Sequence, residues 1–149
     1  MRAVVQRTTG SRVLVDNQEI ATIDKGLMIL LGIRKGDSTR DADYLMDKII
    51  NLRIFPDEND KMNLSLLDIG GEILLVSQFT LYGDVRKGRR PSFTEAELPD
   101  AALPLFEYCT VQLQKAGVNV QTGEFGADMI VEISNDGPCT ILLDSARQF

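Results

Sequence analysis

The early part of the chain alternates between apolar and polar residues, a pattern typical of β-strands. The alternation covers residues 3–7, 11–15 and 18–23, and Asp16-Asn17 supplies a turn before the last of these stretches. We therefore expect three strands in an antiparallel meander. Residues 27–33 are apolar on both faces, which predicts a central strand that is covered on each side.

Two later stretches show helical spacing instead. After the cap candidates Asp37 and Ser38, apolar residues recur three and four positions apart. This face consists of Ala42, Leu45, Met46, Ile49 and Ile50. The second pattern begins near Pro99 and ends at Gly117, and its apolar residues are Leu103, Phe106, Cys109 and Leu113. The spacing predicts two main helices.

The remaining apolar runs predict further strands, the first of which follows Gly70-Gly71. These strands cover 72–78, 119–122, 129–134 and 139–143. Residues 135–138 would form a hairpin-like link between the last two, at a sheet edge. About twenty residues without regular structure precede the second helix, and connections of that length are often functional. With 149 residues, the chain has the length of a single mixed α/β domain, 1–149.

The composition is that of an ordinary globular protein, with 44% hydrophobic and 26% charged residues. No apolar run reaches the ~18 residues of a membrane helix, and Arg2 is followed directly by strand-like residues rather than by a signal peptide. We therefore expect a cytoplasmic protein with no membrane partner. Cys109 and Cys139 are then expected to be reduced and buried. Because no residues are clustered as metal ligands, we predict no bound metal or cofactor.

Positive charge is concentrated in one loop of an otherwise acidic chain. The net charge of −6 argues against a protein that coats nucleic acid nonspecifically. Four cations nevertheless lie within five residues, at Arg86, Lys87, Arg89 and Arg90. Such a patch can bind a few phosphates without making the whole surface basic. The alternative is a solvated loop that contributes only to solubility.

Two short polar segments at the ends of apolar runs are the candidate site. They are Ser77-Gln78-Phe79-Thr80-Leu81 and Asn135-Asp136-Gly137-Pro138-Cys139-Thr140. Neither contains an obvious general base, and the chain has no histidine. This excludes Ser-His-Asp and Cys-His catalysis. Hydrolysis here would have to use backbone groups, hydroxyls, a positioned water or the substrate itself.

Together with the basic loop, the two segments resemble the signature of the D-aminoacyl-tRNA deacylases. The resemblance runs from residues 2–7 to 142–144 and therefore covers nearly the whole chain. Two positions depart from the family pattern. The family usually has valine where this chain has Cys139, and Gly83 is a second, milder departure. Both positions keep a small residue. The resemblance implies a mixed, mostly antiparallel α/β fold, with a barrel-like sheet and two main helices.

The first segment can support ester hydrolysis through its backbone. An aminoacyl ester is already labile, so orienting water and stabilising the oxyanion accelerates its cleavage. Where the strand ends, the N–H groups of Phe79 and Thr80 can point at the developing charge, and such donors are worth about 3 to 4 kcal/mol each. Ser77 and Thr80 are alternative nucleophiles, but neither has a base to activate it. Their hydroxyls could instead only hold the strand end by hydrogen bonds to the backbone.

The family resemblance implies that the terminal ribose 2′-hydroxyl of the tRNA assists the reaction while the protein supplies geometry. Gln78 and Phe79 would then seat the 3′-terminal adenosine, because an amide suits a base edge and an aromatic ring suits its face. Met129 is a candidate to complete that pocket, with core packing as the equally open alternative.

Gly137-Pro138 is the candidate for selectivity. A Gly-Pro bond can be cis at a cost of about 0.5 to 1 kcal/mol, which would turn two carbonyl oxygens the same way and create acceptors for an α-ammonium group. With the ammonium group and the ester both held, L-residues would collide with the backbone. The resemblance implies a cis bond, braced by Arg7 and inserted into the partner's site in a homodimer. On its own, however, the dipeptide is more typical of an ordinary tight turn, and only its occurrence together with the first segment favours the selectivity role.

The leading hypothesis is an editing hydrolase that removes D-amino acids, and glycine mischarged on tRNA(Ala), from tRNA. One alternative keeps the fold but has a trans Gly-Pro bond and acts on L-alanyl-tRNA. A second alternative is a noncatalytic module that binds nucleic acid through residues 86–90 and stacks bases on Phe79 or Phe93.

Overall fold

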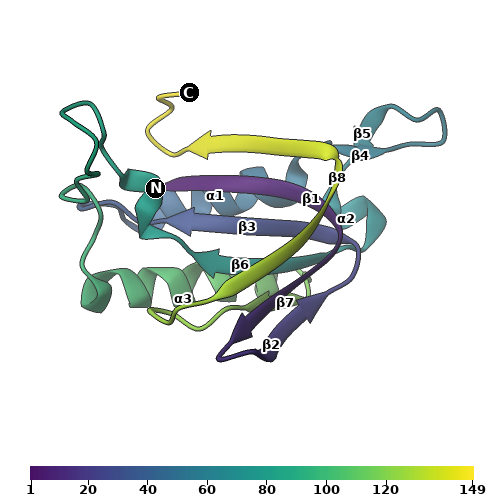
Figure 1. Ribbon diagram of the computed structural model, residues 1–149. Coiled ribbons are helices and arrows are strands. Elements are labelled where there is room, and N and C mark those ends of the chain that lie inside the picture. Colours follow the sequence, from purple (N-terminus) through teal and green to yellow (C-terminus); the bar gives the residue numbers. More distant parts are fainter.

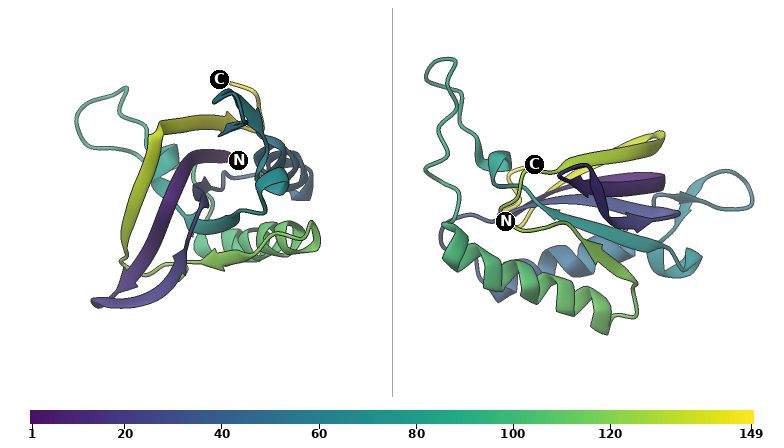
Figure 2. Two further views of the ribbon diagram at one scale, coloured as in Figure 1. Left: turned by 90° about the vertical axis from the view of Figure 1, so that its right-hand side faces the viewer. Right: turned by 60° about the horizontal axis from the view of Figure 1, so that its bottom comes forward.

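The computed structural model describes residues 1–149 and shows a strongly curved sheet with helices on one side (Figure 1). Strands β2 (Gln18–Ile23), β1 (Arg2–Val15), β3 (Gly26–Gly32), β6 (Glu72–Ser77) and β7 (Val120–Thr122) follow one another across the sheet. Strand β8 (Ile130–Asp144) pairs with the free side of β1. Because β1 bends and carries β8 along its length, the sheet curls into a nearly closed barrel, as the resemblance implied (Figure 2).

Strand β1 corrects the prediction of two separate strands at 3–7 and 11–15. It is a single strand of 14 residues that pairs antiparallel with β3 through its first half and with β2 through its second half. Its pairing with β8 is interrupted near Thr8, where the register shifts. Such bulges bend a strand without ending it, so the sequence pattern is interrupted while the strand continues.

Both faces of the central strand are buried, as its apolar pattern predicted. Leu27, Ile29 and Leu31 of β3 point into a large core beneath the helices. Met28 points the other way, into a smaller cluster that β1, β2 and β6 enclose on the inner side of the curl. Successive residues of a strand point to opposite faces, so a strand between two cores is apolar throughout. The two clusters hold the sheet in its curved shape.

The two main helices, α1 (Thr39–Asn51) and α3 (Pro99–Lys115), cover the outer face of the sheet (Figure 2). At the start of α1, the Ser38 N–H donates to the Asp41 carboxylate at 2.9 Å. Shorter elements fill the connections: β4 (Phe55–Pro56), β5 (Met62–Leu64), the single turn α2 (Leu66–Ile69) and the 3₁₀ turn η1 (Phe79–Tyr82). None of the helices is long and apolar enough to cross a membrane.

Candidate active site

The first polar segment lies where β6 ends and η1 begins. The Gln78 N–H still donates to the Leu31 carbonyl of β3, at 2.8 Å. The next two N–H groups, of Phe79 and Thr80, open the 3₁₀ turn and have no acceptor in the chain. A helix leaves its first N–H groups without an internal partner, which makes them available to a negative ligand. Two adjacent donors are therefore free at the end of the strand.

The hydroxyls of this segment have no base beside them. The Thr80 Oγ1 accepts a hydrogen bond from the Gln78 side-chain amide, at 2.5 Å. The hydroxyl of Ser77, which is half-buried, has no hydrogen-bond partner, and no imidazole exists in the chain. Neither hydroxyl bonds to the backbone, so the structure does not show the alternative in which both hold the strand end by such bonds. The geometry supplies no group that would activate either of them as a nucleophile.

A cavity of about 610 Å³ opens beside these residues. Its wall includes Ser77, Gln78 and Phe79 from the first segment and Leu98 from the loop before α3. The ring of Phe79, which is 56% exposed, meets the ring of Phe93 edge-on, with 5.1 Å between centroids. The cavity therefore offers aromatic and apolar surface next to the free N–H groups, a combination that suits a nucleobase.

Met129 both lines the cavity and packs in the core, the two roles that the sequence left open. Its side chain lines this cavity and also packs against the smaller core cluster inside the curl. It approaches Gly123 closely, because a Cβ at Gly123 would lie 2.6 Å from the Met129 sulfur. Met129 is thus a half-buried wall between the core and the cavity.

The second segment is a bulge within β8, which corrects the predicted hairpin-like link. Strand β8 continues through it, with Asn135 paired to Thr8 and Thr140 paired to Gln6. The intervening residues leave the ladder, and the Gly137-Pro138 peptide bond among them is cis. The Asn135 side chain spans the bulge, because its Oδ1 accepts from the Cys139 N–H at 3.1 Å. Its Nδ2 also donates to the Thr140 Oγ1, at 3.0 Å.

Arg7 braces this bulge from the inside. It is only 8% exposed, and its Nε donates to the Asp136 carbonyl at 3.2 Å and lies 3.1 Å from the Asp136 carboxylate. Its Nη1 donates to the Ile54 carbonyl, so the guanidinium links the bulge to the chain after α1. A buried cation requires partners of this kind. Gly137 lies against the same side chain, since a Cβ there would be 3.0 Å from the Arg7 Nη2.

Within one chain, the two segments lie at opposite ends of the sheet. Asn135 pairs with Thr8, which in turn pairs with Gly26 at the start of β3. Ser77 pairs with Leu31, near the end of β3. At about 3.3 Å per residue, Asn135 lies about 17 Å from Ser77 along the strands. The other end of the segment, Thr140, pairs with Gln6, which pairs with Met28, and is about 10 Å away along the strands. A single copy of the chain therefore does not bring Gly137 and Pro138 to the cavity.

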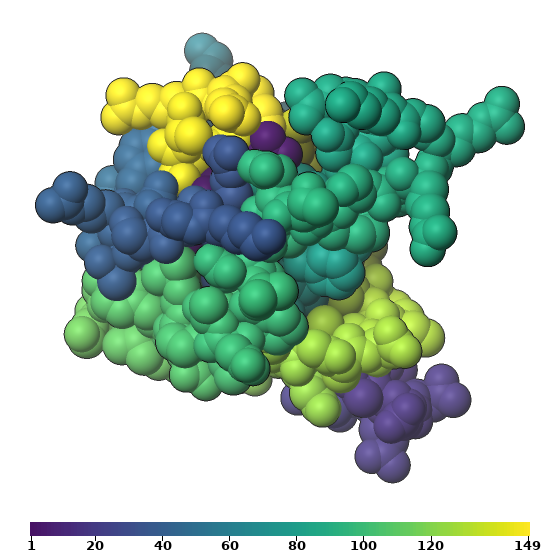
Figure 3. Space-filling model, turned by 90° about the vertical axis from the view of Figure 1, so that its left-hand side faces the viewer, coloured from purple at the N-terminus to yellow at the C-terminus, as the bar shows by residue number.

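The basic loop projects from the same end of the molecule as η1 (Figure 3). Two backbone hydrogen bonds between Asp84 and Ser92, of 2.8 and 2.9 Å, close its base. Arg86 folds back and binds the Asp84 carboxylate with contacts of 2.9 and 2.7 Å, which lowers the pKa of Asp84 to about 2. The other cations, Lys87, Arg89 and Arg90, are exposed and form no ion pair. Three of the four predicted cations are therefore free to meet phosphates.

Some residues at this end were not found from the sequence pattern. Asp84 neutralises the charge of Arg86. The sequence holds one signal for this contact: Asp84 lies two residues before Arg86, and an aspartate side chain often accepts from the backbone N–H two residues further on. Leu98 lines the cavity but carries no sequence signal.

The two cysteines add no reactive group to the site. Cys109 and Cys139 are both buried and unpaired, and burial raises the pKa of the Cys109 thiol. No three His, Cys, Asp or Glu side chains gather as a metal site.

Comparison with known proteins connects this geometry to a family. The sequence model of the D-Tyr-tRNA(Tyr) deacylase family matches residues 4–144. The chain is 65% identical to the D-aminoacyl-tRNA deacylase of Syntrophomonas wolfei subsp. wolfei and 60% identical to that of Clostridioides difficile, over the full length of both chains in each case.

Solved structures share the fold. The c-Myc DNA Unwinding Element Binding Protein superposes with a TM-score of 0.91 at 41% identity, covering 97% of this chain and 98% of the other. A probable eukaryotic D-amino acid tRNA deacylase has a TM-score of 0.80 at 19% identity, with 95% and 97% covered, which shows the fold alone. A full-length match to the family, with both polar segments and the basic loop present, shows that this chain belongs to the D-aminoacyl-tRNA deacylases, hydrolases of the aminoacyl-tRNA ester bond.

Proposed function

We propose that this deacylase cleaves D-aminoacyl-tRNA with main-chain atoms rather than with a reactive side chain. The observation that carries the proposal is the pair of unpartnered N–H groups of Phe79 and Thr80 beside a cavity of about 610 Å³, which Phe79 lines. Two such donors can bind the oxyanion that forms when water attacks the ester. The absence of histidine and of any base beside Ser77 or Thr80 supports the same mechanism.

The 3′-terminal adenosine would occupy the cavity. Phe79 and Phe93 offer ring surface for the base, Gln78 offers an amide for its edge, and Met129 closes the wall. The adjacent ribose would then present its ester to the free N–H groups and its 2′-hydroxyl to the attacking water. In this arrangement the protein supplies position, and the substrate supplies the hydroxyl that helps to move the proton.

Selectivity for D-residues would come from the Gly137-Pro138 bulge of a second copy of the chain. The bulge lies about 10 to 17 Å along the strands from Ser77 of its own chain, so a second copy would have to deliver it. Arg7 and Asn135 hold the bulge by hydrogen bonds, which makes its carbonyl oxygens fixed acceptors for an α-ammonium group. Backbone placed there would exclude an L side chain and admit hydrogen or a D side chain. The active form would then be a homodimer with shared sites.

The acceptor stem would lie along the basic loop. Lys87, Arg89 and Arg90 are exposed, unpaired and on the same end of the molecule as the cavity, so they can contact phosphates on either side of the bound terminus. Since aminoacyl-tRNA is the substrate, we place the enzyme in the cytoplasm. Because the selectivity argument needs no side-chain pocket, glycine mischarged on tRNA(Ala) is a second expected substrate.

The substrate experiment uses tRNA charged with D-tyrosine, L-tyrosine, L-alanine or glycine and follows loss of the ester. Rapid loss of the D-tyrosyl and glycyl esters, with the L-tyrosyl and L-alanyl esters intact, is the expected result. Cleavage of L-alanyl-tRNA instead would favour the alternative specificity. Bound tRNA with no cleavage of any ester would contradict the proposal as a whole.

The mechanism is tested by two substitutions at one position. Thr80→Ala removes the hydroxyl but keeps the N–H, so substantial turnover should remain. Thr80→Pro removes the N–H, which has no acceptor in the chain, and kcat should fall by about 10²- to 10³-fold, the usual effect of one lost oxyanion donor. Abolition of turnover by Thr80→Ala would overturn the backbone mechanism and make the hydroxyl a nucleophile. Thermal unfolding of both variants checks that each is folded.

A further inference from the structure

We propose that Arg2 is a positioning residue for the reaction, holding the η1 turn so that the N–H groups of Phe79 and Thr80 keep their direction. The inference rests on the proposed role of those two groups as oxyanion donors. Arg2 is the first residue of β1 and does not line the cavity. Its effect on catalysis would therefore pass through the turn rather than through contact with the substrate.

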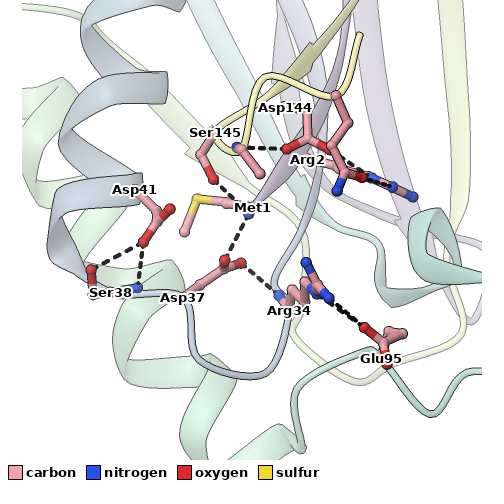
Figure 4. Close-up of polar contacts among 11 residues, drawn as sticks. Met1, Arg2, Arg34, Asp37, Ser38, Asp41, Glu95, Asp144 and Ser145 are labelled. Atoms are coloured by element: carbon pink, nitrogen blue, oxygen red, sulfur yellow. Dashed lines mark hydrogen bonds and ion pairs between the residues drawn. The ribbon is translucent and has the colours of Figure 1, made fainter.

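The guanidinium of Arg2 connects the turn to the end of β8. Its Nη1 donates to the Leu81 carbonyl of η1 at 3.1 Å, and its Nε donates to the Asp144 carboxylate at 3.0 Å. Figure 4 shows Asp144 facing Arg2. Asp144 is itself almost fully buried and also accepts from the Ala146 N–H at 2.7 Å. Because arginine presents several donors in one rigid plane, a guanidinium fixed by Asp144 also fixes the position of the Leu81 carbonyl.

A second contact acts on the next residue of the turn. The Arg2 guanidinium carbon lies 4.7 Å from the centroid of the Tyr82 ring, within the range of a cation–π interaction. Tyr82 is buried, and burial raises the pKa of its hydroxyl well above the usual value. The two residues that end η1 are thus both held by one side chain.

The opposite side of the turn rests on the backbone of β3. A Cβ at Gly32 would lie 2.9 Å from the Gln78 carbonyl oxygen and 3.1 Å from the Leu81 Cβ, so the turn packs as closely on this strand as a glycine allows. With Arg2 above and Gly32 below, η1 has little room to shift or rotate. Oxyanion donors need this constraint, because displacements of the order of 1 Å at a reacting centre can cost about 10²-fold in rate.

The test compares Arg2→Met with Arg12→Met. Both remove an arginine of β1 that pairs with a carboxylate of β8, since Arg12 binds Glu132 at 2.6 Å, but only Arg2 touches η1. In single-turnover assays with D-tyrosyl-tRNA, we expect Arg2→Met to lower the rate at saturating enzyme at least tenfold with the KM for tRNA within twofold. Arg12→Met should leave both values near those of the unsubstituted protein.

Two further measurements separate positioning from general stability. Arg2→Lys keeps a cation that can reach Asp144 or Leu81 but not both, so it should restore part of the rate. Hydrogen exchange of the amides of residues 79–83 should become faster in Arg2→Met and stay unchanged in Arg12→Met, whatever the substrate assays give.

The inference has clear contrary outcomes. A raised KM with an unchanged rate would make Arg2 a tRNA-binding residue and would overturn the inference. Equal rate losses in Arg2→Met and Arg12→Met, or unchanged exchange of residues 79–83, would also overturn it. If the unsubstituted protein cleaves no D-aminoacyl ester, the proposed function fails instead, and the exchange experiment still decides whether Arg2 holds the turn.

Discussion

At the scale of single residues, the candidate site depends on backbone positions that leave no room for change. Gly137 combines a φ of +123° with a close contact, since an added Cβ would lie 3.0 Å from the Arg7 Nη2 and 3.1 Å from the Cys139 N. L-residues rarely adopt such a φ, and Arg7 cannot retreat easily because it is held by Asp136 and Ile54. Side chains here serve mainly to place the backbone.

We predict that Gly137→Ala abolishes most of the turnover while the protein stays folded. The added methyl group must displace Arg7 or the bulge, so the carbonyl oxygens of residues 137 and 138 move from their positions. The matched control is Gly117→Ala, at the end of α3, where φ is +88° but no atom lies within 4 Å of an added Cβ. Both variants should lose about 1 kcal/mol of stability from backbone strain, measured by urea unfolding. Full activity of Gly137→Ala would remove the bulge from the mechanism.

At the scale of elements, the basic loop and helix α1 differ in what they contribute: the loop carries charges next to the candidate site, and the helix packs against the strands that carry it. The basic loop is closed by the Asp84–Ser92 backbone pair and carries three unpaired cations and one that Asp84 neutralises. Helix α1 has no part in the site, yet its buried face supports the strands that carry the site's residues. The loop therefore belongs to the proposed binding of tRNA, whereas the helix contributes to the stability of the fold.

We predict that Asp84→Asn strengthens tRNA binding by freeing Arg86. The variant should lower KM and steepen the salt dependence of binding by about 0.7 to 0.9 in log–log slope if one phosphate contact is gained. Asp16→Asn is the control, because it makes the same change of charge in the exposed β1–β2 turn. An identical slope for both variants would mean that only net charge matters.

The Asp84–Arg86 pair also has a defined pH dependence. Arg86 lowers the pKa of Asp84 to about 2, below its value in the unfolded chain. The contribution of the pair is therefore complete above about pH 4 and is lost as the pH falls through about 2. Across assays from pH 5 to 8, the Asp84→Asn effect should stay constant, which a KM series at several pH values checks.

We predict that Leu45→Ala costs about 2 to 5 kcal/mol of unfolding free energy, because Leu45 of α1 is fully buried in the larger core. Leu67→Ala on α2 is the control, since Leu67 is 43% exposed and its truncation should cost less than about 1 kcal/mol. Denaturant unfolding of both variants measures the difference. Equal losses would mean that α1 does not support the core as the burial indicates.

At the scale of the whole molecule, the position of the two segments is the central fact. They lie at opposite ends of one sheet, so a site that contains both requires a second copy of the chain. An isologous dimer uses the same surface twice and would create two such sites at once. The net charge of −6 is compatible with this arrangement, because the cations proposed to contact tRNA are gathered on one loop.

We predict that two inactive variants complement each other when mixed. Gly137→Ala and Thr80→Pro damage different halves of the shared site, so a mixed dimer would contain one site with both halves intact. After exchange of subunits at equal concentrations, about a quarter of the wild-type activity should return, since half of the dimers are mixed and each has one intact site. Sedimentation confirms the dimer, and a mixture that stays inactive would show that each site lies within one chain.

Much of the architecture was accessible from local patterns. The helix at 39–51, the apolar strand at 26–32 and the strand that ends at Ser77 were all predicted, because periods of 3.6 and 2 report which faces are buried. Both polar segments and the basic loop were also identified from residue type alone. The absence of histidine is by itself enough to exclude several catalytic mechanisms.

The errors lay where a strand is interrupted without ending. Residues 2–15 and 130–144 were each divided into two strands, the first because the alternating pattern lapses between residues 7 and 11, and the second because Gly137-Pro138 is typical of turns. Each long strand in fact pairs with the other on both sides of the irregularity, so the partner holds the strand together where the local pattern fails. A single sequence does not show which distant strand pairs with a given strand.

The sequence by itself determined which segments are buried, which residues have chemistry to offer, and which catalytic mechanisms are impossible, because these follow from composition and from short-range periodicity. Only the tertiary structure decided that the N–H groups of Phe79 and Thr80 are free, that Arg2 donates to the Leu81 carbonyl of their turn, and that the Gly137-Pro138 bulge does not line the cavity of its own chain. These properties depend on strand register and on contacts between residues distant in the chain, and no local pattern encodes either.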